Sequence, residues 1–180
     1  MKIAVLKEKR DIDGRVILLP DAVKQLVGQG HTVLVEKDAG KRIYISNEEY
    51  KEAGAKIVKN PFSADIIVKI RAPLPNEFRK LRKGPILMSF LHINSFPQYA
   101  EIIRRKKCKA IAWELIKDKD GKRLVGVSRI SGELGMLEAF RYAKKIPEEC
   151  KVLVLGPGEM GSGAIQTAMR LGANVQILGR

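Results

Sequence analysis

Four side chains that can bind a carboxylate or move a proton lie near the ends of predicted strands. Arg15 follows the first apolar run through a polar loop, and later runs end at or near Arg71, His92 and Glu114. An arginine guanidinium can grip a carboxylate through two parallel hydrogen bonds. A histidine titrates close to neutral pH and can serve as general acid or base. Because ligands of open parallel sheets gather at the carboxyl ends of the strands, these residues predict a site for a small carboxylate-bearing molecule.

Each of these residues also has a simpler interpretation, which the sequence leaves open. Arg15 could be a surface-loop residue, and Arg71 an exposed residue at the sheet edge. A histidine that ends a buried strand, as His92 does, is often a packed and hydrogen-bonded group. Glu114 could pair with a neighbouring lysine. Their shared position at one edge of the predicted sheet is what favours a common site.

A glycine-rich turn near the end of the sequence is the second candidate site. An apolar strand leads into GPGEMG, and a helix-period segment and a second apolar run follow. In this order the helix N-terminus presents free backbone N–H groups to a pyrophosphate. Gly156 permits the tight turn, Gly158 lets the backbone approach phosphate, and Gly161 lets helix and strand pack closely. With Glu159 and Met160 between them, they predict a dinucleotide site; a glycine turn without a ligand is the alternative.

The end of the second apolar run bears on which dinucleotide is bound. A carboxylate there suits the ribose 2′-hydroxyl of NAD, whereas an arginine suits the 2′-phosphate of NADP. This run ends Leu178-Gly179-Arg180 and carries no acid. Arg180 therefore favours NADP, with NAD as the alternative.

Apolar runs alternate with helix-period segments along the whole sequence, which is typical of an α/β fold with a parallel sheet. The run from Pro85 to Leu91 is almost wholly apolar, as expected of a parallel strand covered on both faces. The sequence predicts a doubly wound parallel sheet of flavodoxin or Rossmann type over residues 1–128. A bridging helix and linker over 129–149 then lead to the first βαβ unit of a Rossmann domain over 150–180. Since two strands make a poor parallel sheet, we expect the chain to be a portion of a longer enzyme, and inactivity of this portion by itself stays open.

The composition is 45% hydrophobic, and no apolar run approaches the length of a membrane span. The two cysteines, each beside a lysine, indicate neither a disulfide framework nor a metal site, so a cytoplasmic location is expected. The formal net charge of +14 raises the possibility of nucleic-acid binding. No basic strand with interspersed aromatic residues and no recognition helix accompanies that charge. We expect the positive electrostatic field to attract an anionic cofactor and carboxylate substrates instead.

Several segments together resemble a known family. They are GRVILLPDAVKQLVGQGHTVLVEKDAG, NEEYKEAGAKIV, ADIIVKIRAPLP and ILMSFLH. They resemble the N-terminal domain of the superfamily of alanine dehydrogenase, proton-translocating nicotinamide nucleotide transhydrogenase and saccharopine dehydrogenase. The resemblance spans essentially the whole chain, and the glycine turn falls where that family's nucleotide domain begins. It implies an NAD(P)-dependent oxidoreductase that acts on amino-acid C–N bonds.

The resemblance also implies roles for individual residues. The family's carboxylate-binding arginine falls on Arg15, and its catalytic histidine falls on His92. Its catalytic lysine falls on Arg71, within Lys69-Ile70-Arg71-Ala72-Pro73. Arginine can hold a carboxylate and polarise a carbonyl, but it does not readily lose a proton. Lys69 is therefore a further catalytic candidate. Glu114 is a substrate-binding candidate because of its place near a strand end.

Within the superfamily, the segments DKDGKRLV and SGELGM, the short loop before the nucleotide strand and the Gly179-Arg180 ending favour one branch. That branch contains saccharopine dehydrogenase (lysine-2-oxoglutarate reductase) and carboxyethylornithine synthase, which join an amino acid to a 2-oxo acid with NADPH. Alanine dehydrogenase or a transhydrogenase alpha-type enzyme is the first alternative, and a nucleotide-binding module without catalysis is the second. The implied partners are an amino acid and a 2-oxo acid, and self-association as a homo-oligomer stays open.

Overall fold

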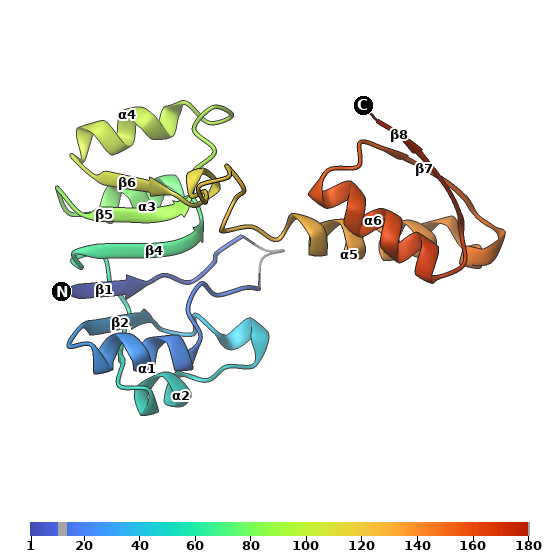
Figure 1. Cartoon of the computed structure of the whole chain (residues 1–180). Helices are drawn as coiled ribbons and strands as arrows, with labels where there is room; N and C mark the ends of the chain where they lie inside the picture. Colours follow the sequence, from blue (N-terminus) through green and yellow to red (C-terminus); the bar gives the residue numbers. More distant parts are fainter. Residues whose placement is uncertain (11–13, 180) are drawn as a thin grey trace. The chain divides into compact units, whose positions relative to one another are not determined.

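The computed structural model describes residues 1–10 and 14–179, which form two compact units. Unit 1 comprises Met1–Val125, and unit 2 comprises Gly126–Arg180. Figure 1 shows the strands and helices of each unit in the colours of the sequence. No helix in the described part of the chain is long and apolar enough to cross a membrane.

Unit 1 is built on a six-stranded sheet in the order β3-β2-β1-β4-β5-β6, in which every neighbouring pair is parallel. The order reverses between β1 and β4, as in a Rossmann sheet, and this is the point where such sheets bind ligands. The strands are β1 (Lys2–Val5), β2 (Thr32–Glu36), β3 (Lys56–Val58), β4 (Ile66–Arg71), β5 (Ile86–Phe90) and β6 (Lys109–Ala112).

Helices cover both faces of this sheet, and each face has its own core. One face packs against α1 (Pro20–Gly28) and α2 (Asn47–Glu52), with Val23 and Tyr50 fully buried among the strand residues. The other packs against α3 (Pro75–Lys80) and α4 (Gln98–Arg105), with Phe78 and Tyr99 in the core. Figure 1 shows the two helix pairs on opposite sides of the strands. A capping box begins α2: the Ser46 hydroxyl accepts from the Glu49 N–H and the Glu49 carboxylate accepts from the Ser46 N–H.

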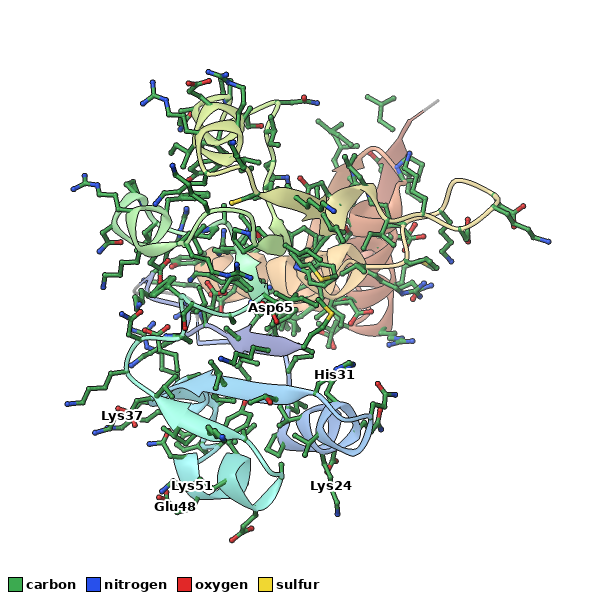
Figure 2. The ribbon with its side chains drawn as sticks, turned by 90° about the vertical axis from the view of Figure 1, so that its left-hand side faces the viewer. Lys24, His31, Lys37, Glu48, Lys51 and Asp65 are labelled. Carbon is green, nitrogen blue, oxygen red and sulfur yellow. The ribbon has the colours of Figure 1, made fainter. Side chains whose placement is uncertain are left out.

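Figure 2 looks toward the edge of unit 1 where the strands begin. His31 and Asp65 come from the segments that lead into β2 and β4, and their side chains are labelled there. The Asp65 carboxylate accepts from the Lys2 N–H and pairs with the exposed Arg82 at 2.7 Å. This ion pair is thus partly solvated.

Strand β4 contains an irregularity just before it ends. Val68 lies opposite Met88 of β5, but Arg71 lies opposite Phe90, so that two residues of β4 face one residue of β5. The side chains change side at the same point. Ile67 packs in the α3/α4 core and Lys69 reaches Glu77 of α3, yet the next residue in that core is Ala72. The extra residue therefore turns Arg71 to the face away from Lys69.

Unit 2 contains two parallel strands, β7 (Lys151–Leu155) and β8 (Asn174–Leu178), and the helices α5 (Ser128–Ala143) and α6 (Glu159–Arg170). The two helices touch through glycines. A Cβ on Gly132 would overlap the carbonyl oxygen of Met160, and one on Gly163 would overlap that of Arg129. This close approach requires glycine at both positions.

The α/β fold class with a parallel, doubly wound sheet is confirmed. The main differences lie at helix ends. The bridging helix predicted within residues 129–149 begins at Ser128, ends at Ala143 and packs on α6 within unit 2. Helix α6 begins at Glu159 and so includes Gly161 and Gly163. Glycine is a poor helix former, so the first turns of α6 are hard to predict from the spacing of apolar residues. The apolar run that leads toward Glu114 forms a strand only as far as Ala112, and a short 3-10 turn, η2 (Trp113–Leu115), follows it.

Candidate functional site

The carboxyl edge of the unit 1 sheet gathers the residues predicted to do chemistry. β1, β4 and β5 are neighbours, β6 lies beside β5, and all run in the same direction. Arg71 ends β4, His92 lies two residues beyond β5, and Glu114 lies in η2 directly after β6. The sheet thus brings these three residues to one edge, beside the β1–β4 reversal.

The backbone of Arg71 is held by a buried carboxylate that sequence reasoning missed. One carboxylate oxygen of Glu8, Oε1, accepts from the N–H of Ile70 at 2.8 Å and from the N–H of Arg71 at 3.2 Å. Glu8 is 2% exposed and follows β1, the strand paired with β4. A carboxylate that accepts two backbone N–H groups makes strong, charge-assisted hydrogen bonds. The Arg71 side chain is itself engaged with neighbouring groups.

Lys69 is 1% exposed. Its Nζ donates to Glu8 Oε2 at 3.1 Å and to the carbonyl oxygen of Lys7 at 3.0 Å, and it lies 3.6 Å from Glu77 Oε2. Because a buried ammonium needs such partners, these contacts account for the residue structurally. They weigh against Lys69 as a catalytic residue that replaces the family's lysine.

Lys9 extends this buried network toward the end of β2. Its Nζ lies 2.7 Å from Glu36 Oε1 and 2.9 Å from Glu77 Oε1. Burial by itself would lower the pKa of Lys9, but the hydrogen bonds and charges of Glu36 and Glu77 outweigh it and raise the pKa. Glu36 also accepts from the N–H of Lys7 at 3.0 Å. The loop that follows β1 is therefore fastened to β2, β4 and α3.

His92 combines a constrained backbone with an exposed ring. Its φ is 45°, in the left-handed region that few residues other than glycine adopt. The side chain is 55% exposed and stacks on Phe90, with ring centroids 5.9 Å apart. Such backbone strain persists where neighbouring structure enforces it, and it is concentrated at functional sites. The ring is thus accessible to a ligand at the strand end.

Glu114 enforces that backbone. Its Oε1 accepts from the His92 N–H at 2.6 Å and its Oε2 from the Leu91 N–H at 3.2 Å. The imidazole Nδ1 of His92 lies 4.0 Å from the same carboxylate. Both carboxylate oxygens are engaged with backbone, and the residue is 8% exposed. This placement supports a positioning role, so direct substrate binding by Glu114 stays a prediction.

Arg15 lies after residues 11–13 and before α1, and its side chain is exposed. It takes part in an interaction with a neighbouring group. Its predicted contact with a substrate carboxylate remains a prediction.

The glycine turn of unit 2 lines a pocket of about 430 Å³. Gly156 has a φ of 88°, which glycine adopts without strain. A Cβ on Gly161 would overlap the carbonyl oxygen of Gly156, whereas one on Gly156 or Gly158 would meet nothing within 4 Å. The turn is thus closed on its helix side and open where a ligand would approach. The lining residues are Ser128, Leu155, Gly156, Gly158, Glu159, Met160, Gly161 and Ala164.

These features fit a pyrophosphate-bearing cofactor. Gly158 caps helix α6, and Glu159, Met160 and Gly161 form its first turn. The first N–H groups of a helix have no partner inside the helix, and the helix dipole favours an anion there. Arg180, predicted to favour NADP, lies outside the described residues.

Comparison with known proteins identifies the family. The family described as "Alanine dehydrogenase/PNT, N-terminal domain" matches residues 4–132, and "Alanine dehydrogenase/PNT, C-terminal domain" matches residues 136–180. This chain belongs to the alanine dehydrogenase/PNT family. The family part of the resemblance is confirmed, and the saccharopine dehydrogenase branch is not supported.

Curated members of the alanine dehydrogenase/PNT family align with nearly the whole chain. The alanine dehydrogenases of Staphylococcus haemolyticus and Bacillus subtilis are each 33% identical over 99% of this chain. The alanine dehydrogenase of Methanococcus maripaludis is 34% identical over the same share. The chain spans about half the length of these relatives, 52% of the first two and 53% of the third.

Solved structures agree with this assignment. A structure titled "L-alanine dehydrogenase" superposes with a TM-score of 0.90 at 32% identity, over 98% of this chain and 54% of that one. A transhydrogenase from Sinorhizobium meliloti superposes with a TM-score of 0.84 at 24% identity, which shows a shared fold. It covers 98% of this chain and 58% of the other.

Proposed function

We propose that this chain is the substrate-binding and cofactor-binding portion of a pyridine-nucleotide-dependent amino-acid dehydrogenase of the alanine dehydrogenase type. Such an enzyme interconverts an amino acid with its 2-oxo acid and ammonium. The observation that carries the proposal is the alignment of nearly the whole chain with alanine dehydrogenases at about one-third identity. This favours the alanine dehydrogenase alternative over the saccharopine-forming reaction that the sequence first suggested.

The proposed substrate site is the carboxyl edge of the unit 1 sheet. Arg15 binds the substrate carboxylate, since a guanidinium offers two parallel donors that match its geometry. Arg71 stabilises the partial negative charge on the oxo oxygen of the 2-oxo acid. His92 accepts or returns the proton that moves when the C–N bond changes, because its exposed ring stands at the strand end.

Arg71 makes one difference from the family pattern chemically important. A lysine at this position could donate or accept a proton, whereas a guanidinium stays charged at all ordinary pH values. Arg71 can therefore stabilise charge but cannot relay a proton. All proton transfer in the proposed reaction then rests on His92 and water.

The proposed cofactor is a pyridine nucleotide, with NADP favoured by Arg180 and NAD as the alternative. It would supply the hydride acceptor or donor. The residues that would surround its pyrophosphate are Gly156, Gly158, Glu159, Met160 and Gly161, with backbone N–H groups at the start of α6 as the donors. The N–H of Gly156 itself donates to the carbonyl oxygen of Leu178, so Gly156 contributes the open turn. The pocket above the turn is consistent with this assignment.

The test is a nicotinamide absorbance assay on the purified full-length protein, with NADH and NADPH in parallel. One arm supplies pyruvate with ammonium, and another supplies a 2-oxo acid with lysine or ornithine. We expect turnover in the first arm and a loss of at least about a hundredfold in His92→Ala. Turnover only in the second arm would replace the proposal by the saccharopine-type reaction.

Binding measurements cover the remaining alternative. Calorimetry should detect a pyridine nucleotide and pyruvate on the same protein. Dinucleotide binding without turnover in either arm, unchanged by His92→Ala, would indicate a nucleotide-binding module without catalysis. The guanidinium of Arg71 in place of the family's lysine favours this alternative, because a guanidinium cannot relay a proton.

A further inference from the structure

We infer that Glu8 is a positioning residue for Arg71, and that Lys69 holds Glu8 in place. The inference rests on the proposed function for its effect on substrate. Glu8 does not reach the substrate itself in this scheme. It fixes the backbone from which the Arg71 side chain leaves the sheet.

The irregularity in β4 is the reason why the backbone at Arg71 needs a side-chain partner such as Glu8. Two residues of β4, Lys69 and Ile70, face the single residue Ser89 of β5. An extra residue of this kind leaves ladder groups without their strand partners and re-aims the side chains that follow. Here it sends Arg71 to the face opposite Lys69, since Ala72 takes the place in the α3/α4 core that Arg71 would otherwise occupy. The direction of Arg71 thus depends on keeping this irregularity in place.

The backbone groups near the irregularity are held by side chains. Glu8 Oε1 accepts both the Ile70 and the Arg71 N–H groups. On the other side, the indole N–H of Trp113 donates to the carbonyl oxygen of Lys69 at 3.1 Å. Buried backbone groups are costly when unpaired, so removal of the Glu8 oxygen would favour a regular ladder or a shifted one. Either change would redirect Arg71.

Lys69 couples this arrangement to the core. Its ammonium binds the second oxygen of Glu8, so that each oxygen of the carboxylate has a fixed partner. Both side chains are 1% exposed. Charge compensation and amide binding are therefore separate roles of one carboxylate, and substitutions can separate them.

Two double variants make a matched pair. Glu8→Gln/Lys69→Met removes both charges but keeps a side-chain oxygen that can accept the two N–H groups. Glu8→Ala/Lys69→Met removes the same charges and the oxygen as well. Neither leaves a buried charge without its partner in the Glu8–Lys69 pair, so both are expected to fold, which thermal unfolding checks. Each is also made with Arg71→Ala.

The first readout is amide hydrogen exchange at residues 70 and 71, measured by NMR. We expect exchange about tenfold faster or more in Glu8→Ala/Lys69→Met than in Glu8→Gln/Lys69→Met. Equal exchange at Arg71 in the two variants would overturn the inference. If Glu8→Ala/Lys69→Met does not fold, slow exchange at both residues in Glu8→Gln/Lys69→Met supports it and fast exchange overturns it.

The second readout is the dissociation constant for pyruvate. We expect about tenfold weaker binding in Glu8→Ala/Lys69→Met than in its glutamine counterpart, because small displacements of a binding group are costly. In the Arg71→Ala background this difference should vanish, since Glu8 acts through Arg71. If the two double variants still differ in pyruvate binding when Arg71 is alanine, the positioning role is overturned. Such a persistent difference is what a general loss of stability would produce.

Failure of the two proposals can be told apart. If the unaltered protein binds neither pyruvate nor another 2-oxo acid, the proposed function fails. In that case the amide exchange rates at residues 70 and 71 alone test whether Glu8 holds the Arg71 backbone. If pyruvate binds and the matched pair does not differ in either readout, only the role of Glu8 is refuted.

Discussion

The two candidate sites hold their backbones in opposite ways. In unit 1, buried carboxylates bind the N–H groups at the ends of two strands: Glu8 at Arg71 and Glu114 at His92. In unit 2, the strand end is shaped by missing side chains, since Gly156 takes a positive φ and Gly161 lies against its carbonyl oxygen. A buried carboxylate fixes the backbone of a strand end, so that the side chains there can contact a ligand in a defined direction. Glycines leave the main chain exposed, so that a ligand can bind its N–H groups directly.

The difference teaches which changes each site tolerates. A carboxylate site depends on charge balance, because its groups lie where water cannot compensate them. A glycine site depends on space, because a Cβ on Gly161 would meet backbone that cannot move aside. The first should respond to pH and to loss of a partner, and the second to added volume. Trp113, the one tryptophan of the chain, lies in η2, so its fluorescence reports unit 1 separately.

The largest expected effect breaks the charge balance of unit 1. Glu8→Ala leaves the buried ammonium of Lys69 without its nearest carboxylate, and we expect the free energy of unfolding to fall by about 3–5 kcal/mol. Urea unfolding followed by Trp113 fluorescence measures this. The double variant Glu8→Ala/Lys69→Met should recover much of the loss. A single variant as stable as the original protein would show that the pair is not a buried charge balance.

The next effect adds volume to unit 2. Gly132→Ala places a Cβ against the carbonyl oxygen of Met160, and we expect a destabilisation of unit 2 by about 1–3 kcal/mol or more. Amide exchange in α6 should accelerate while Trp113 fluorescence is unchanged. Gly135→Ala is the matched control in the same helix, because nothing lies within 4 Å of its added Cβ. It should stabilise by about 0.5–1 kcal/mol, and equal behaviour of the two variants would refute the packing argument.

Alkaline pH should weaken unit 1 through Tyr50 and Lys9. Burial, and then the charge of Glu49, raise the pKa of Tyr50 to about 12 from 10.0, and its hydroxyl donates to the carbonyl oxygen of Leu18. Because the pKa of Tyr50 is higher in the folded state than in the unfolded state, the protonated hydroxyl stabilises the fold. This contribution is complete below the pKa of the unfolded state and is lost as pH rises from about 10 toward 12. The raised pKa of Lys9 acts in the same sense above 10.5.

The measurement is the urea midpoint of Trp113 fluorescence from neutral to alkaline pH. It should fall above about pH 10, and Tyr50→Phe should reduce the slope of that fall. A slope that Tyr50→Phe leaves unaltered would assign the effect to other groups.

The smallest expected effect concerns charges outside the buried network. Glu48 and Lys51 form an exposed pair on α2 at 3.1 Å, and Figure 2 shows their labels together. Glu48→Ala should leave the unfolding midpoint of unit 1 unchanged within error, because exposed pairs are solvated and screened. A loss comparable to that of Glu8→Ala would mean that burial does not distinguish the two kinds of pair.

Much of the fold could be predicted from the sequence, because strand runs and helix stops are local. The run from Pro85 to Leu91 predicted a covered parallel strand, and β5 lies in the interior of the sheet. Glu8 was missed because a Lys-Glu-Lys sequence after a strand looks like a solvated loop. Its position directly after a buried strand was the available signal, since that is the edge where ligands gather.

The sequence by itself determined the residue types at the strand ends, the glycines of the turn and the alternation of strands and helices. Only the tertiary structure decided the strand order, the irregularity in β4 and the burial of Lys69. Local patterns record what each segment can do, whereas the side to which Arg71 turns depends on a carboxylate 63 residues away in the chain. Pairing between distant segments follows from packing the whole sheet, which no local spacing encodes.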